Sequence, residues 1–157
     1  MKQIHQHSFE IEEWDFQALP KESIELLKAA HASALTAYAP HSQFLVGCAL
    51  RLNSGAIVMG SNQENMAYPS GLCAERVAFF AAGAQHPDDP IVSAAIVTPV
   101  EMEVRHFSPC GGCRQVMIES EHRQVTPIEI LLQTANGPVL RSKNAAQFLP
   151  LSFRLPL

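Results

Sequence analysis

The chain has 157 residues, of which 47% are hydrophobic and 17% are charged. This length predicts one domain with a substantial buried core, and the composition excludes general disorder. The formal charge of −4 and the scattered Lys and Arg residues argue against a nucleic acid polymer as partner. No apolar run is long enough to span a bilayer, and the N-terminus lacks the apolar centre of a secretory signal. We therefore expect a soluble, cytoplasmic protein with no membrane contact.

The first part of the chain predicts an arm, a helix and a hairpin. Residues 1–18 alternate apolar and polar side chains, which indicates an extended arm or an edge strand. Pro20 suits a first helical position, and an apolar stripe continues to Tyr38, so we expect an amphipathic helix over this range. The β-rich runs 44–52 and 56–61 flank an Asn-Ser-Gly turn and predict two paired strands.

The rest of the chain alternates helical and β-rich segments. Helix formers predict helices over 73–83 and 113–122, and a β-rich run predicts a strand over 91–100. Residues 127–142 predict a strand, an Asn-Gly turn and a second strand. This order predicts an α/β fold, a single domain over residues 1–157 with three layers (α/β/α) and a mixed sheet of about five strands. We assign the N-terminal arm no catalytic role.

Three of the four cysteines, Cys73, Cys110 and Cys113, fall at predicted helix starts, where backbone N–H groups lower a thiol's pKa. Cys110 and Cys113 are one helical turn apart and face the same way, so three thiolates can converge on one metal ion. Three protein ligands leave a position open for water, as in catalytic zinc sites. Glu75 is near enough to Cys73 to act as proton acceptor for that water. Cys48, within an apolar strand, is expected to be a structural thiol.

The charge of such a site also involves two arginines. Three thiolates and one Zn²⁺ sum to −1, which by itself would weaken the metal's ability to acidify water. Arg76 and Arg114 each follow a site residue directly. Together with the two helix N-termini, they can donate hydrogen bonds to sulfur and compensate the thiolate charge.

Four segments carry a family resemblance: FLVG (44–47), GSNQEN (60–65), YPSGLCAERVA (68–78) and SPCGGCRQV (108–116). Together they resemble the short-chain, homotetrameric, zinc-dependent cytidine deaminases, from about residue 38 to residue 153. The resemblance implies hydrolytic deamination of cytidine and deoxycytidine to uridine and deoxyuridine, with release of ammonia, in pyrimidine salvage. It also implies one Zn²⁺ per subunit, held by the three cysteines, with Glu75 as the proton shuttle.

The same resemblance implies a set of substrate contacts. Asn62 and Glu64 would bind the ribose hydroxyls, since an amide and a carboxylate form an acceptor-rich pair for a 3′-hydroxyl. Phe44 would pack on the pyrimidine. Tyr68 and Phe153 would reach the site of a neighbouring subunit, which implies a homo-oligomer, most simply a tetramer, with shared sites.

The sequence departs from the family pattern at His41, Leu45 and Met66, where a Tyr, a Pro and a small residue are common. These positions bear on nucleoside fit and subunit contact and leave the cysteine motifs unchanged. Two alternatives stay open. One is a related deaminase of nucleoside antibiotics of the blasticidin type, which the ribose-binding segment disfavours. The other is a non-catalytic zinc-binding or thiol-redox module, with which an isolated Cys-x-x-Cys pair is also compatible.

Overall fold

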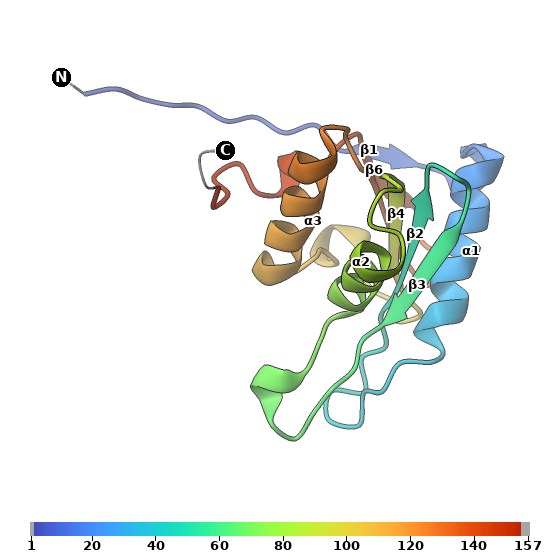
Figure 1. Ribbon diagram of the computed structural model, residues 1–157. Helices are drawn as coiled ribbons and strands as arrows, with labels where there is room; N and C mark the ends of the chain where they lie inside the picture. Colours follow the sequence, from blue (N-terminus) through green and yellow to red (C-terminus); the bar gives the residue numbers. More distant parts are fainter. Residues whose placement is uncertain (1, 155–157) are drawn as a thin grey trace.

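A mixed sheet of six strands runs through the centre of the computed structural model, which describes residues 2–154 (Figure 1). The strand order is β1-β6-β5-β4-β2-β3, and β4 and β5 form the parallel pair among otherwise antiparallel neighbours. The strands are β1 (Glu12–Trp14), β2 (Gly47–Leu52), β3 (Ile57–Ser61), β4 (Ile91–Thr98), β5 (Glu129–Thr134) and β6 (Val139–Ser142).

Three α-helices cover the two faces of the sheet: α1 (Lys21–Ala34), α2 (Ala74–Gln85) and α3 (Gly111–Gln124). Helix α1 lies on one face, and α2 and α3 lie on the other (Figure 1). Short 3₁₀ helices occupy Phe16–Ala18, Tyr68–Ser70, Val104–His106 and Ala145–Phe148. The predicted α/β/α layering is confirmed. In the part of the chain that the structure describes, no helix has the length and apolar character needed to cross a membrane.

The two faces of the sheet build two separate cores. On β2, Ala49 packs with Leu26 and Leu27 of α1. Its neighbour Leu50 points the other way, into a core that includes Phe79 of α2 and α3 residues. This alternation follows from the period of two in a strand, so that a strand covered on both faces is apolar throughout.

The strand directions bring the starts of α2 and α3 to the same edge of the sheet. Strand β2 is antiparallel to both β3 and β4, so β3 and β4 run in the same direction. Helix α2 follows β3 and helix α3 follows β4 in the chain. Both helices therefore begin beyond the carboxyl ends of these strands, and this edge is where their N-terminal residues meet.

The sheet has six strands because part of the predicted arm adds an edge strand, β1, to β6. The register places Glu12 opposite Arg141 and Trp14 opposite Val139. The Arg141 guanidinium lies 5.5 Å from the Trp14 ring and 3.4 Å from a Glu12 carboxylate oxygen. Its second carboxylate partner is Glu129, at 2.6 Å. The prediction of an edge strand is confirmed for residues 12–14.

Two predicted boundaries are wrong, and both errors have the same physical origin. Helix α1 ends at Ala34 instead of reaching Tyr38, because Tyr38 pairs with the segment after β3, donating from its N–H to the Asn62 carbonyl at 3.0 Å. Strand β2 begins at Gly47 instead of Phe44, because the Asn62 side chain takes the backbone groups of residues 44 and 46. In each case, Asn62 in the segment that follows β3 bonds backbone groups that the predicted helix or strand would have used.

Gly60 sets the distance between β3 and α2. A Cβ atom at this position would lie 2.6 Å from the Ala78 nitrogen and 2.7 Å from the Ala74 carbonyl oxygen. Both atoms belong to the α2 backbone, which cannot yield as a flexible side chain would. The absence of a side chain at Gly60 therefore allows the first turns of α2 to pack directly against β3.

We expect Gly60→Ala to push α2 outward and to lower the free energy of unfolding by about 1–3 kcal/mol. Urea denaturation of the zinc-loaded protein measures this change. Gly83→Ala, a glycine substitution within α2 itself, is the matched control, because its Cβ would meet only an Arg123 side-chain nitrogen, at 3.7 Å. This control should be neutral or stabilise the protein by up to about 1 kcal/mol, as Ala favours helix over Gly. Equal losses in both variants would contradict the close packing at Gly60.

Candidate active site

Three cysteine sulfur atoms meet where α2 and α3 begin. Cys73 is the N-cap residue of α2, Cys110 is the N-cap residue of α3, and Cys113 lies in the first turn of α3. The three sulfur atoms lie within 4.8 Å of one another, with 3.9 Å between Cys73 and Cys110 and 3.5 Å between Cys110 and Cys113. Both N-cap side chains leave the backbone N–H groups of the helix start free, so the positive ends of two helices face the cluster.

The three sulfurs fit a zinc ion. Tetrahedral coordination with Zn–S bonds of about 2.3 Å requires sulfur atoms about 3.8 Å apart, and the separations of 3.9 Å and 3.5 Å bracket this value. Among residues 2–154, no other group of three or more His, Cys, Asp or Glu side chains is close enough to hold a metal ion. Three thiolates are soft ligands that suit zinc, and three ligands instead of four leave one coordination position open.

The thiols share their protons unequally. A hydrogen bond from the Cys113 thiol lowers the pKa of Cys73 to about 5, and contacts with Arg76 and Cys110 act in the same direction. The same hydrogen bond, together with burial, raises the pKa of Cys113. The cluster therefore forms its first thiolate on Cys73, and a bound cation must displace the proton that Cys113 retains.

The two arginines of the site differ in what they contact. Arg76 donates to the Cys73 sulfur at 3.9 Å and to the Gly71 carbonyl at 3.5 Å. Arg114 donates to three oxygens instead: the Pro109 carbonyl at 2.7 Å, the Ser108 hydroxyl at 2.9 Å and the Phe148 carbonyl at 3.1 Å. Arg114 thereby fastens the loop that precedes Cys110. Arg76 contacts a site sulfur directly, which supports its predicted role in compensating the thiolate charge. The same role stays a prediction for Arg114.

Glu75 is a buried carboxyl group beside the cluster. It is the second residue of α2, its side chain is 4% exposed, and its Oε2 atom has no hydrogen-bond partner among the described residues. Burial raises the pKa of Glu75 to about 7. A carboxyl group with this pKa can both accept and donate a proton near neutral pH.

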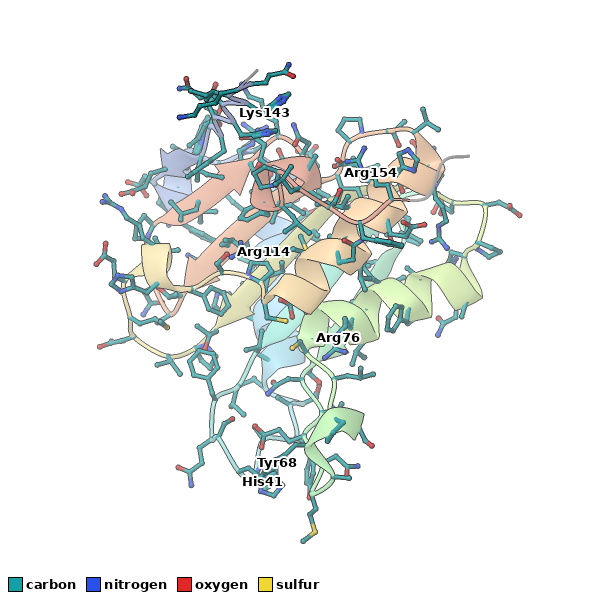
Figure 2. All side chains as sticks on the ribbon, turned by 90° about the vertical axis from the view of Figure 1, so that its left-hand side faces the viewer. His41, Tyr68, Arg76, Arg114, Lys143 and Arg154 are labelled. Atoms are coloured by element: carbon teal, nitrogen blue, oxygen red, sulfur yellow. The ribbon has the colours of Figure 1, made fainter. Side chains whose placement is uncertain are left out.

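A cavity of about 550 Å³ extends from Cys73, the one cysteine of the cluster in its lining, to the segment that follows β3. Its lining includes Cys73 and Arg76 on one side, and Asn62, Glu64 and Tyr68 on the other. Figure 2 shows Arg76 and Arg114 on the neighbouring helices α2 and α3, and His41 beside Tyr68 at the tip of the loops. The rings of His41 and Tyr68 are 5.8 Å apart in an edge-on arrangement. We call this space the site cavity.

Asn62 and Glu64 are both hydrogen-bonded to the loop formed by residues 41–46. Asn62 accepts from the Val46 N–H at 2.8 Å and donates to the Phe44 carbonyl at 2.9 Å. Glu64 accepts from the His41 N–H at 2.7 Å, from the Ser42 N–H and from the Ser42 hydroxyl. These donors, the hydroxyl foremost, lower the pKa of Glu64. Sequence reasoning missed Ser42, because a single serine in a loop carries no pattern.

The predicted aromatic residues lie apart from one another. Phe44 is half-buried and packs 6.4 Å from the ring of Phe107, which sequence reasoning did not single out. Tyr68 lines the site cavity but is 76% exposed. Phe153 is 71% exposed, and its backbone N–H and carbonyl bond the Gln115 side chain on α3. Neither Phe44 nor Phe153 lines the site cavity.

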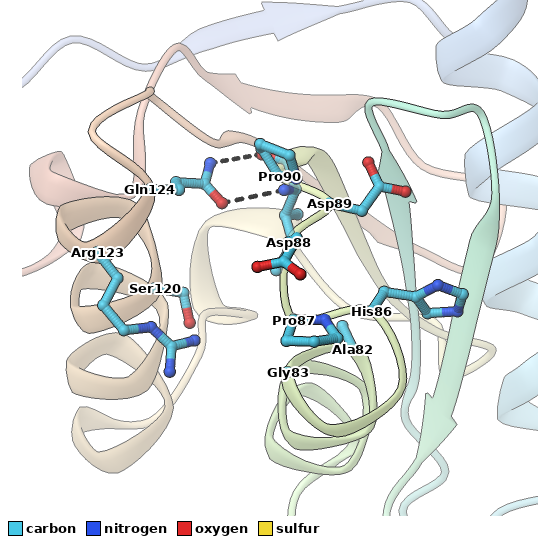
Figure 3. A pocket seen from close by; sticks show the side chains of 11 residues that line it. Ala82, Gly83, His86, Pro87, Asp88, Asp89, Pro90, Ser120, Arg123 and Gln124 are labelled. Atoms are coloured by element: carbon cyan, nitrogen blue, oxygen red, sulfur yellow. Dashed lines mark hydrogen bonds between the residues drawn. The ribbon is translucent and has the colours of Figure 1, made fainter.

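A second cavity, of about 400 Å³, lies at the opposite ends of α2 and α3 (Figure 3). Gln124 closes one side of it by bonding both the N–H and the carbonyl of Ile91, at 3.0 and 2.7 Å. None of the predicted site residues lines this cavity. Of these two cavities, the site cavity at the helix starts is the candidate active site.

Comparison with known proteins identifies relatives of this chain. The family model described as the cytidine and deoxycytidylate deaminase zinc-binding region matches residues 20–128. A cytidine deaminase of Halalkalibacterium halodurans is 40% identical over 105 residues, which cover 67% of this chain and 71% of that protein. The crystal structure of cytidine deaminase from Burkholderia pseudomallei is 38% identical, with a TM-score of 0.72, and the match covers 82% of this chain and 97% of that one. The structure from Mycobacterium tuberculosis is 30% identical, with a TM-score of 0.63, over 83% and 96% of the two chains.

The contrast between the two arginines generates a prediction about zinc retention. In Arg76→Gln the thiolates lose a positive neighbour, so their pKa values rise and protons compete with zinc at higher pH. We expect zinc release on acidification to shift upward by about one pH unit. A chromophoric chelator, added across a pH series, measures the release.

Arg114→Gln is the control for this experiment, because Arg114 bonds oxygens instead of sulfur. It should lower the free energy of unfolding through the loosened loop and leave the pH of zinc release close to that of the parent protein. Equal upward shifts in the two variants would show that the contact between Arg76 and Cys73 has no special electrostatic role.

Proposed function

The chain belongs to the cytidine and deoxycytidylate deaminase family, and we propose from this premise that it deaminates free cytidine and deoxycytidine to uridine and deoxyuridine. The reaction is hydrolytic, depends on zinc and releases ammonia. The observation that carries the proposal is the site cavity, which joins a sulfur cluster suited to zinc to a polar end suited to a sugar. A cytoplasmic role in pyrimidine salvage fits free nucleosides as substrates.

The chemistry divides between the metal and Glu75. Cys73, Cys110 and Cys113 would hold the zinc ion, which when bound would lower the pKa of a water molecule enough to make it a nucleophile at neutral pH. Glu75 moves two protons in turn: its carboxylate takes the first from the attacking water and passes it to the ring nitrogen. It then takes the second from the added hydroxyl and passes it to the amino group, which leaves as ammonia. A pKa of about 7 for Glu75 suits both halves of this cycle.

The charges in the site cavity favour a nucleoside over a nucleotide. Glu64 keeps its negative charge, because its hydrogen-bond donors lower its pKa. Arg76 is engaged with Cys73, and His41 is the other basic side chain in the lining. An uncharged sugar can donate its hydroxyl hydrogens to Glu64 and Asn62, whereas a phosphate would meet a carboxylate.

A panel of substrates tests the proposal. We expect loss of the cytidine absorbance band and release of ammonia with cytidine and deoxycytidine, and no turnover of cytosine, adenosine or cytidine 5′-monophosphate. Efficient turnover of the nucleotide would contradict the preference for free nucleosides and would indicate a phosphate-binding site. Activity restricted to a nucleoside antibiotic would favour a deaminase of the blasticidin type. No turnover of any compound, with zinc in place, would favour a non-catalytic zinc-binding module.

We predict that Glu75→Gln keeps the fold and about one zinc per chain but lowers kcat by about three powers of ten, because the amide cannot relay protons. Steady-state kinetics with metal analysis on the same sample measures both quantities. Glu119→Gln on the exposed face of α3 is the matched control and should retain parental turnover. Near-normal turnover by Glu75→Gln would assign this residue a structural role.

We further propose a homotetramer in which Tyr68 and Phe153 complete the site of a neighbouring subunit. The support is that both aromatic side chains are largely exposed in one subunit, at 76% and 71%. Aromatic side chains of this size are commonly buried against a partner subunit or a ligand. The competing interpretation is that Phe153 only caps its own subunit.

Shared sites predict complementation between two damaged subunits. A subunit with Glu75→Gln still supplies Phe153 to a partner that carries Phe153→Ala and an intact Glu75. Co-expression of the two variants should therefore give more activity than the sum of the two alone. Phe153→Ala must first be shown to lose activity while keeping its zinc and its assembly. Mixed oligomers with only the summed activity would exclude shared sites.

A further inference from the structure

We propose that Ser42 is a positioning residue for nucleoside binding, because its hydroxyl couples the Glu64 carboxylate to the backbone that carries Phe44. This inference rests on the proposed function, in which Glu64 faces the sugar, and on the expectation from the family resemblance that Phe44 packs on the pyrimidine. It extends that function by giving a loop serine, which carries no sequence motif of its own, a defined effect on substrate affinity.

The Ser42 hydroxyl is used in both directions. It donates its single hydrogen to the Glu64 Oε1 atom and accepts from the Phe44 N–H at 3.0 Å. These two roles are compatible, since a hydroxyl offers one hydrogen and two lone pairs. The Ser42 oxygen is therefore a direct bridge between the carboxylate and the backbone of the aromatic residue.

Glu64 is held by two consecutive residues. Besides the Ser42 hydroxyl, the Ser42 N–H donates to both carboxylate oxygens, at 3.2 Å to Oε2 and 3.3 Å to Oε1, and the His41 N–H donates to Oε2 at 2.7 Å. Three donors of the loop therefore make four contacts with the Glu64 carboxylate. The charged or titratable side chains that line the site cavity with Glu64 are His41, Tyr68, Cys73 and Arg76. These contacts fix the orientation of the Glu64 carboxylate where it lines the site cavity and faces a sugar hydroxyl in the proposed function.

The loop between these anchors is conformationally costly. Gln43 has a φ of 56°, in the left-handed region that favours glycine, and its N–H donates to the Ala39 carbonyl at 3.0 Å. This conformation is unfavourable for a residue with a side chain and persists only where its surroundings hold it. Asn62 holds the loop from one side through the Phe44 carbonyl and the Val46 N–H, and Ser42 holds it from the other. Loss of the Ser42 hydroxyl therefore removes one contact of Glu64 and one contact of Phe44 together.

Three variants test this coupling. Ser42→Ala removes the hydroxyl, and Ser42→Thr restores it. Ser54→Ala is the matched control, because the Ser54 hydroxyl also accepts from the N–H two residues on, at 3.3 Å, but does so in the turn between β2 and β3. Each variant is compared with the zinc-loaded parent enzyme for kcat, KM and zinc content, with cytidine as substrate.

We expect Ser42→Ala to raise KM about tenfold, with kcat within about threefold of the parent and zinc content unchanged, because binding is weakened while the proton chemistry is kept. Ser42→Thr should recover most of the affinity, and Ser54→Ala should match the parent. In a Glu64→Gln background the effect of Ser42→Ala should fall to about twofold, since the two residues act through one contact. Unchanged KM in Ser42→Ala, or full independence of the two substitutions, would overturn the inference.

A second readout does not depend on turnover. Carbon-13 NMR of the glutamate carboxyl groups follows the titration of Glu64, whose pKa should rise toward its ordinary value in Ser42→Ala and stay low in Ser54→Ala. If the parent enzyme deaminates no nucleoside, the proposed function fails and the role of Ser42 in substrate binding fails with it. If the parent enzyme is active but the pKa of Glu64 is the same in all variants, only the Ser42 inference fails.

Discussion

The direct contact between β3 and α2 at Gly60 determines where chemistry can occur in this fold. A side chain at this position would collide with the backbone of α2, so its absence sets the height of that helix on the sheet. The height of α2 in turn sets the positions of Cys73 and Glu75 at its start. Because β3 and β4 run in the same direction, α3 begins at the same edge and adds Cys110 and Cys113. A backbone contact and a strand direction together build the sulfur cluster.

The two carboxylates of the site are held in opposite states by their surroundings. Glu75 is buried with an unpaired oxygen, and burial raises its pKa to about 7. Glu64 accepts hydrogen bonds from three donors of its loop, which lower its pKa. A residue that must exchange protons needs the first environment, and a residue that must accept hydrogen bonds from a sugar needs the second. The raised pKa of Glu75 also limits the negative charge that accumulates beside the cysteine thiolates.

The metal cluster could be predicted from the sequence, but the structure of the loop that faces it could not. The Cys110–Cys113 spacing and the helix starts are local features, which made the three ligands predictable, whereas the strand directions bring Cys73 to the other two. The layers and the strand pairing also followed from periodicity and turns. The segments around Tyr38 and Phe44 were assigned wrongly, because their backbone groups pair with the residues that follow β3, and such long-range pairing leaves no periodic signal. Ser42 was missed for a related reason: its role comes entirely from its contacts with Glu64 and Phe44.

The short edge strand β1 has a consequence for how copies of the chain can associate. An uncovered β6 would offer its outer row of N–H and carbonyl groups to any passing strand, which is a common route to aggregation. Strand β1 covers that row with only three residues, and Glu12 and Glu13 lie within it, with Glu10 just before. Two such edges brought together could form only a very short ladder. Continuous sheets across subunits are therefore disfavoured at this edge.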